Sequence, residues 1–84
     1  MDDETKFGLL DEIAAWLNEN GIKSSRNFGH IICHNVTICH NVTVLLRLDD
    51  SYLHAYGGGA QKFQSYDLHN PEAFDELLKW LKTQ

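Results

Sequence analysis

Two Cys-His pairs, Cys33-His34 and Cys39-His40, are the residues of this sequence best suited to metal chemistry. Thiolate and imidazole are the usual ligands of zinc, and both also bind copper. The pairs lie six residues apart, which fits neither the Cys-x-x-Cys nor the His-x3-His spacing of common zinc sites. Neighbouring side chains of a β-strand also point to opposite faces, so the four groups converge only where the backbone leaves strand geometry. Metal binding by these four residues is therefore the alternative hypothesis, and the favoured one has no metal ligand.

Nucleophilic catalysis by Cys33 or Cys39 finds no supporting motif in the chain. A catalytic thiol needs a lowered pKa, an orienting group and a site for the oxyanion. The glycine run at residues 57–59 does not match a phosphate-binding loop, because no helix follows it directly and the Gly-x4-Gly-Lys-Ser/Thr pattern is absent. We therefore expect no catalytic residue and no cofactor, and we expect that the protein is not an enzyme.

The two Cys-His pairs belong to a tandem hexapeptide, Ile-Cys-His-Asn-Val-Thr, which occupies residues 32–37 and again residues 38–43. The surrounding stretch 30–48 is rich in Ile, Val and Thr and contains no Gly or Pro, which predicts β-strand. Strand side chains alternate between faces, and Cys33 and Cys39 are expected on the face away from the core. The residues expected on the core face are Ile32, His34, Val36, Ile38, His40, Val42, Val44, Leu46 and Leu48.

The length of the repeat has two consequences for a strand. Because six is an even number, the second copy keeps every downstream side chain on its original face. A neighbouring strand meets the same side chains in either copy, so the register of pairing is only weakly specified.

A single strand over residues 30–48 would span roughly 60 Å, which is far longer than a usual strand. Either turns at His34-Asn35 and His40-Asn41 interrupt it, or the surplus strand pairs with a second copy of the chain. His-Asn is a poor turn signal, so we favour a homodimer formed by strand exchange or edge pairing. The residues expected to carry this self-association are Ile32, Val36, Ile38 and Val42.

Two amphipathic helices are expected to flank the strands, over residues 4–20 and from Asn70-Pro71 onward, because apolar residues repeat there with helical spacing. Asn20-Gly21-Ile22 is typical of a helix end. An edge segment followed by a turn is expected at residues 23–29. A turn and a short strand are expected at residues 49–56, and the last strand at residues 61–68. The sequence thus predicts a single α+β domain over 1–84, in which both helices pack on one face of a three- to four-stranded antiparallel sheet.

The negative charge is concentrated in the first 20 residues, which carry six acidic residues and one Lys in a chain of formal net charge −5. Glu4, Asp11, Glu12 and Glu19 fall together on the polar side of the first predicted helix. Such a stripe is explained by a solvated surface or by a docking surface for a basic protein partner. We expect a small protein-interaction module, such as an inhibitor, an immunity protein or a phage accessory protein.

Nucleic acids and membranes are not expected partners. The predicted order of helix, strands and helix is similar to that of the double-stranded-RNA-binding domain. The basic cluster at the start of that domain's last helix is replaced here by Glu72, Asp75 and Glu76, which predicts no nucleic-acid binding. No apolar run approaches the length of a membrane span, and the N-terminus begins with Met-Asp-Asp-Glu, so we expect a cytoplasmic protein.

Overall fold

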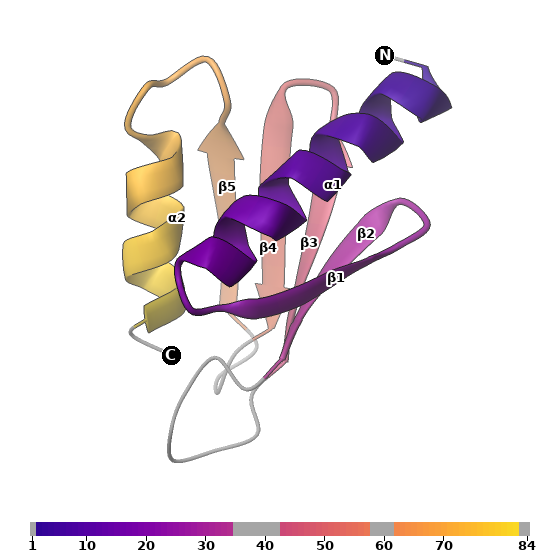
Figure 1. Ribbon diagram of the computed structural model, residues 1–84. Helices are drawn as coiled ribbons and strands as arrows, with labels where there is room; N and C mark the ends of the chain where they lie inside the picture. The colour runs from indigo at the N-terminus through magenta and orange to yellow at the C-terminus, as the bar shows by residue number, and fades with distance from the viewer. Residues whose placement is uncertain (1, 35–42, 58–61, 83–84) are drawn as a thin grey trace.

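The fold is a five-stranded antiparallel sheet with a helix at each end of the chain (Figure 1). The computed structural model describes residues 2–34, 43–57 and 62–82. The strands follow one another across the sheet in chain order, and both helices lie on one of its faces. We call this covered face the inner face and the opposite one the outer face. The elements are α1 (Asp3–Glu19), β1 (Lys23–Asn27), β2 (His30–His34), β3 (Val44–Asp49), β4 (Tyr52–Gly57), β5 (Lys62–Asp67) and α2 (Ala73–Lys82).

This arrangement confirms the predicted α+β class and the placement of both helices on one face, but the predicted strand count was wrong. The sheet has five strands instead of three or four. The edge segment near Lys23 is a full strand, β1, which pairs antiparallel with β2 over five residues. The stretch 30–48, for which an interrupted strand and one long strand were the alternatives, contains two strands that pair antiparallel with each other, so the favoured long strand was wrong.

Both helix ends follow from local capping. The Thr5 N–H donates to the Asp2 side chain at 2.7 Å, which satisfies one of the free N–H groups at the start of α1. At its other end Gly21 has a φ of +86°, and the Ile22 N–H donates to the Leu17 carbonyl at 2.9 Å. These two features are those of the Schellman motif, as Asn20-Gly21-Ile22 predicted.

The start of α2 is also set by a capping residue. The side chain of Asn70 accepts a hydrogen bond from the Glu72 N–H at 3.1 Å, and regular helix begins at Ala73. The helix predicted from Asn70-Pro71 onward is therefore confirmed, with Asn70 as its cap and regular helix starting slightly later than Pro71.

The core lies between the inner face of the sheet and the two helices. Alternation along the strands turns one set of side chains inward, and the apolar arcs of the helices cover them. The buried residues of the strands are Ile31, Cys33, Val44, Leu46, Leu48, Leu53, Ala55 and Tyr66. The buried residues of the helices and the segment after α1 are Leu10, Ile13, Ala14, Leu17, Ile22, Ala73, Leu77 and Leu81.

The predicted core face of the repeat region was correct in β3 and wrong in β2. Val44 is buried as predicted, but in β2 the buried residues are Ile31 and Cys33, while Ile32 is half-buried and His34 is exposed. The reason is the reversal of the chain between β2 and β3, which gives each strand its own alternation. The predictions for Val36, Ile38, His40 and Val42 fall outside the described residues.

Candidate functional site

An apolar groove of about 300 Å³ lies between α1 and α2. Its lining comes from Leu9, Glu12, Ile13 and Trp16 of α1 and from Phe74 of α2. The Trp16 and Phe74 rings contact each other edge to face, with their centroids 5.4 Å apart. Leu9, Trp16 and Phe74 are only partly buried, so an apolar surface stays accessible along the groove. Such a concave apolar surface is the usual form of a binding site.

Helical periodicity explains why the groove has an acidic rim. Residues three and four apart share a helix face, which aligns Leu9, Glu12, Ile13 and Trp16 on the flank of α1 that faces α2. Glu12 is exposed, and Glu19 lies two turns further along the same flank. The groove therefore combines an apolar floor with the Glu12 carboxylate at its α1 side, and Glu19 lies beyond it on the same flank.

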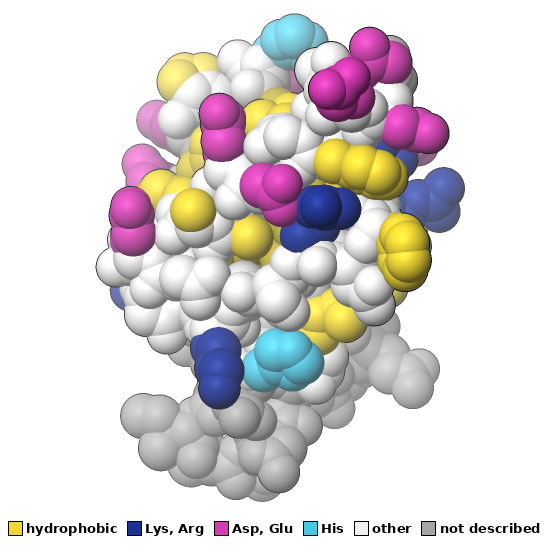
Figure 2. Space-filling model, turned by 45° about the vertical axis from the view of Figure 1, so that its right-hand side comes forward, with side chains coloured by type: hydrophobic (Ala, Val, Ile, Leu, Met, Phe, Trp, Pro, Cys, Tyr) yellow, Lys and Arg dark blue, Asp and Glu magenta, His cyan; other side chains and the backbone are white. Residues whose placement is uncertain are grey.

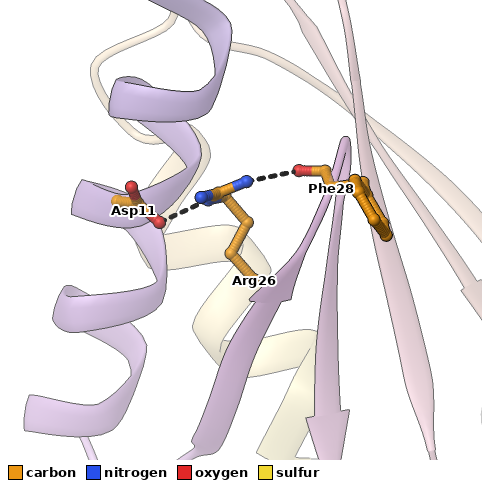
Figure 3. Close-up of polar contacts among 3 residues, drawn as sticks. All are labelled: Asp11, Arg26 and Phe28. Carbon is orange, nitrogen blue, oxygen red and sulfur yellow. Dashed lines mark hydrogen bonds and ion pairs between the residues drawn. The ribbon is translucent and has the colours of Figure 1, made fainter. Parts of the chain in front are cut away.

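The second pair of predicted acidic residues lies on the other flank of α1. Asp11 accepts a hydrogen bond from Arg26 Nε of β1, and Arg26 also donates to the Phe28 carbonyl at 2.9 Å (Figure 3). The guanidinium of Arg26 also lies over the Phe7 ring, 4.8 Å from its centroid. Asp11 thus connects α1 to β1 within the chain, and Glu4 lies two turns before it on the same flank.

The four residues predicted to bind a partner are therefore divided by the structure. All four are exposed, but only Glu12 and Glu19 lie on the flank with the groove. Figure 2 shows acidic side chains at several places over the helix-bearing side, with hydrophobic side chains exposed between them. The sequence had indicated the acidic residues, but not the groove, because the spacing of the two helices depends on tertiary packing.

The two members of the Cys-His pair that the structure describes, Cys33 and His34, lie on opposite faces of the sheet. The Cys33 side chain is fully buried on the inner face, whereas His34 is exposed on the outer face. Burial raises the pKa of the Cys33 thiol, partly offset by the hydroxyl of Ser24, which donates to Cys33 Sγ at 3.5 Å. Within residues 2–34, 43–57 and 62–82, no three His, Cys, Asp or Glu residues are grouped to hold a metal ion. Cys39 and His40 lie outside these ranges.

The outer face carries a cluster of aromatic rings that the sequence analysis did not single out. Centroid distances are 5.0 Å between Tyr56 and Phe63, 5.6 Å between His54 and Phe63, and 6.4 Å between Tyr52 and His54. Phe63 is 53% exposed and Tyr52 is 47% exposed. The alternation of Tyr52, His54 and Tyr56 along one strand was the available signal, and it predicts that the three rings share a face.

No protein-family model, curated protein or solved structure matches this chain. Neither α1 nor α2, the helices of the described part of the chain, is long and apolar enough to cross a membrane.

Proposed function

We propose that this chain is a non-enzymatic protein-interaction module that binds a basic amphipathic helix of another protein in the groove between α1 and α2. The observation that carries the proposal is the groove itself, with Ile13, Trp16 and Phe74 at its floor and Glu12 at its rim. An amphipathic helix that lays its apolar side into a groove is a recurring mode of peptide recognition. The exposed Glu12 and Glu19 favour Lys or Arg on the flank of such a ligand.

The distribution of charge supports a basic partner. The helices and the residues that cap them carry nine of the twelve acidic residues of the chain. These residues are Asp2, Asp3, Glu4, Asp11, Glu12, Glu19, Glu72, Asp75 and Glu76. Only four basic residues, Lys6, Arg26, Lys79 and Lys82, belong to the helices or contact them, so these residues together carry an excess of −5. A field of this sign attracts a cationic segment and raises its rate of association.

The test uses a synthetic peptide of about 18 residues in which Leu and Lys repeat with helical spacing. We expect the fluorescence-labelled peptide to bind the purified protein, and a Leu/Glu peptide of the same pattern to bind far more weakly. Neutralisation by Glu12→Gln with Glu19→Gln removes two exposed charge contacts and should weaken binding about three- to tenfold. Leu9→Ala should also weaken binding, because it removes part of the apolar wall.

The control is the variant Glu4→Gln with Asp50→Asn, which changes the net charge by the same amount away from the groove. Asp50 has a φ of +56°, a conformation that Asn tolerates, so this substitution keeps the turn. Equal affinities of the two double variants, each with an unchanged melting temperature, would show that the groove is not the binding site. A Leu/Glu peptide that binds as well as the Leu/Lys peptide would exclude a basic partner.

A further inference from the structure

The outer face has an apolar row that crosses the sheet. The strand registers place Ile32 beside Leu45, Leu45 beside Tyr56, and Tyr56 beside Phe63. Ile32 and Leu45 are half-buried, Tyr56 is exposed, and no helix of the described chain covers them. Exposed apolar surface that is contiguous over several residues marks an interaction site more often than scattered single residues do.

The row beside it is polar but contains no acidic residue. Its members are Asn27, His30, Arg47, His54 and Ser65, one from each strand. His54 shares a hydrogen bond of 2.7 Å with the Ser65 hydroxyl, and this holds its ring in place beside Phe63. The core of a protein–protein interface is typically rich in aromatic residues and Arg and poor in Asp, Glu and Lys, and this face has that composition at its centre.

The charges on the helix-bearing side and on the outer face indicate which partner the outer face can bind. By alternation, the charged residues that the described strands place on the outer face are Lys23, Arg47, Asp49 and Asp67, two of each sign. The helix side carries a large negative excess, so two copies meeting there repel each other. A balanced face with an apolar centre can meet an identical face without this penalty.

We propose that two copies of this chain associate through their outer faces, as a symmetric dimer with the sheets stacked and the helices outermost. Five strands at about 4.8 Å spacing and six residues at about 3.3 Å give a face of roughly 24 by 20 Å. Its area, roughly 500 Å² per copy, is at the low end for a specific interface, so the dimer is a weak one that forms at roughly a hundred micromolar and dissociates at low micromolar concentrations. This surface differs from the strand exchange expected from the repeat, and of those expected residues Ile32 lies in it.

The experiment measures mass in solution from about 2 to 500 µM, by sedimentation velocity and light scattering. We expect the mass to rise from the 9.6 kDa monomer to twice that value. Tyr56→Lys places like charges at the centre of the symmetric interface and should keep the protein monomeric throughout. Tyr56 is exposed, so a far-UV spectrum and melting temperature close to those of the parent will show that the variant is folded.

The matched control is Phe28→Asn, because Phe28 is 79% exposed and lies in the turn between β1 and β2 rather than on the apolar row. Its φ of +54° suits Asn, and the variant should dimerise like the parent. A parent that stays at 9.6 kDa at every concentration overturns the proposal. A Tyr56→Lys variant that still dimerises also overturns the proposal. If deletion of residues 38–43 then abolishes that dimer, the repeat and not the outer face carries the self-association.

A different occupant of the outer face would also show in this experiment. A parent that remains monomeric but binds a labelled single-stranded oligonucleotide, with binding lost in Tyr56→Lys, would assign the rings to base stacking and overturn the dimer. The Leu/Lys peptide should bind Tyr56→Lys as well as it binds the parent, because the groove lies on the other side of the sheet. The outcomes for the dimer and for the groove are therefore independent.

Discussion

The two faces of the sheet use neighbouring residues of the same strands in opposite ways. In β3 the side chain of Leu46 is fully buried under the helices, while that of Leu45 lies in the half-exposed apolar row of the outer face. Side chains of α1 and α2 cover the inner face, whereas no helix of the described chain covers the outer face of the sheet. Hydrophobic residues on the inner face therefore stabilise the monomer, whereas those on the outer face are available to a partner.

Separate truncation of the two leucines should show the largest difference between the faces. Leu46→Ala leaves a cavity in the core and should lower the free energy of unfolding by about 3 kcal/mol. Leu45→Ala should lower it by about 1 kcal/mol or less, because the residue is only half-buried in the monomer. Chemical denaturation at low micromolar concentration, where the monomer prevails, measures both. Equal losses in the two variants would contradict the assignment of faces.

Ile31 and Ile32 of β2 also lie on opposite faces of the sheet, and here the core face predicted from the sequence was wrong. Ile31→Thr places a hydroxyl at a fully buried position and should destabilise the protein by roughly 2 kcal/mol. Ile32→Thr, one position along on the outer face, should change the stability by less than about 1 kcal/mol. The reverse order of these two losses would restore the face predicted from the sequence.

Ile31 also decides the register between β2 and β3. Shifting the chain by one copy of the repeat would place Thr37 where Ile31 now lies and Cys39 where Cys33 lies, so the core would lose an isoleucine. The two registers are therefore unequal, although the repeat alone makes them look alike. In Ile31→Thr this difference disappears, and we expect doubled or broadened amide signals from β3 in an NMR spectrum. A single sharp set of signals would show that another residue fixes the register.

Local signals in the sequence predicted the helices and the inner face of β3, but not the path of the chain between β2 and β3. Asn20-Gly21-Ile22 and Asn70 act through hydrogen bonds to residues close by, so their roles can be deduced without tertiary structure. Alternation shows which residues of one strand share a face, but it does not show whether the strand continues or reverses. Residues 35–43 contain no Asn-Gly or similar turn pair, so the sequence left a reversal and a continuous strand as alternatives and favoured the continuous strand.

The groove could be predicted only in part, for a related reason. Leu9, Ile13 and Trp16 are among the apolar residues that repeat with helical spacing in the first predicted helix, and Phe74 is among those of the second. Whether two such arcs close on each other or leave a groove depends on the angle and distance between the helices. Those quantities come from the whole core, in which a fully buried residue touches several elements at once.

A smaller effect is expected from shortening the connection between β2 and β3. Residues 35–43 connect the two strands, so the even length of the repeat is not needed to keep the faces in order. Deletion of residues 38–43 leaves three connecting residues instead of nine and should stabilise the protein by up to about 1 kcal/mol through a shorter loop closure. Deletion of only residues 38–42, an odd number, should also give a folded protein. An unfolded odd deletion beside a folded even one would show that the region acts as one strand.

The smallest effect is expected from alkaline titration of Cys33, which is buried on the inner face of β2. Burial raises the pKa of its thiol in the folded protein, so as the pH rises the thiol of the unfolded chain loses its proton first. The unfolded state then binds fewer protons than the folded one, and stability falls as the pH rises. By about pH 9.5 this loss is less than about 1 kcal/mol, measured by urea denaturation under reducing conditions from about pH 7.5 upward. Cys33→Val keeps an apolar side chain there and should flatten this slope, whereas His34→Gln on the outer face should leave it unchanged.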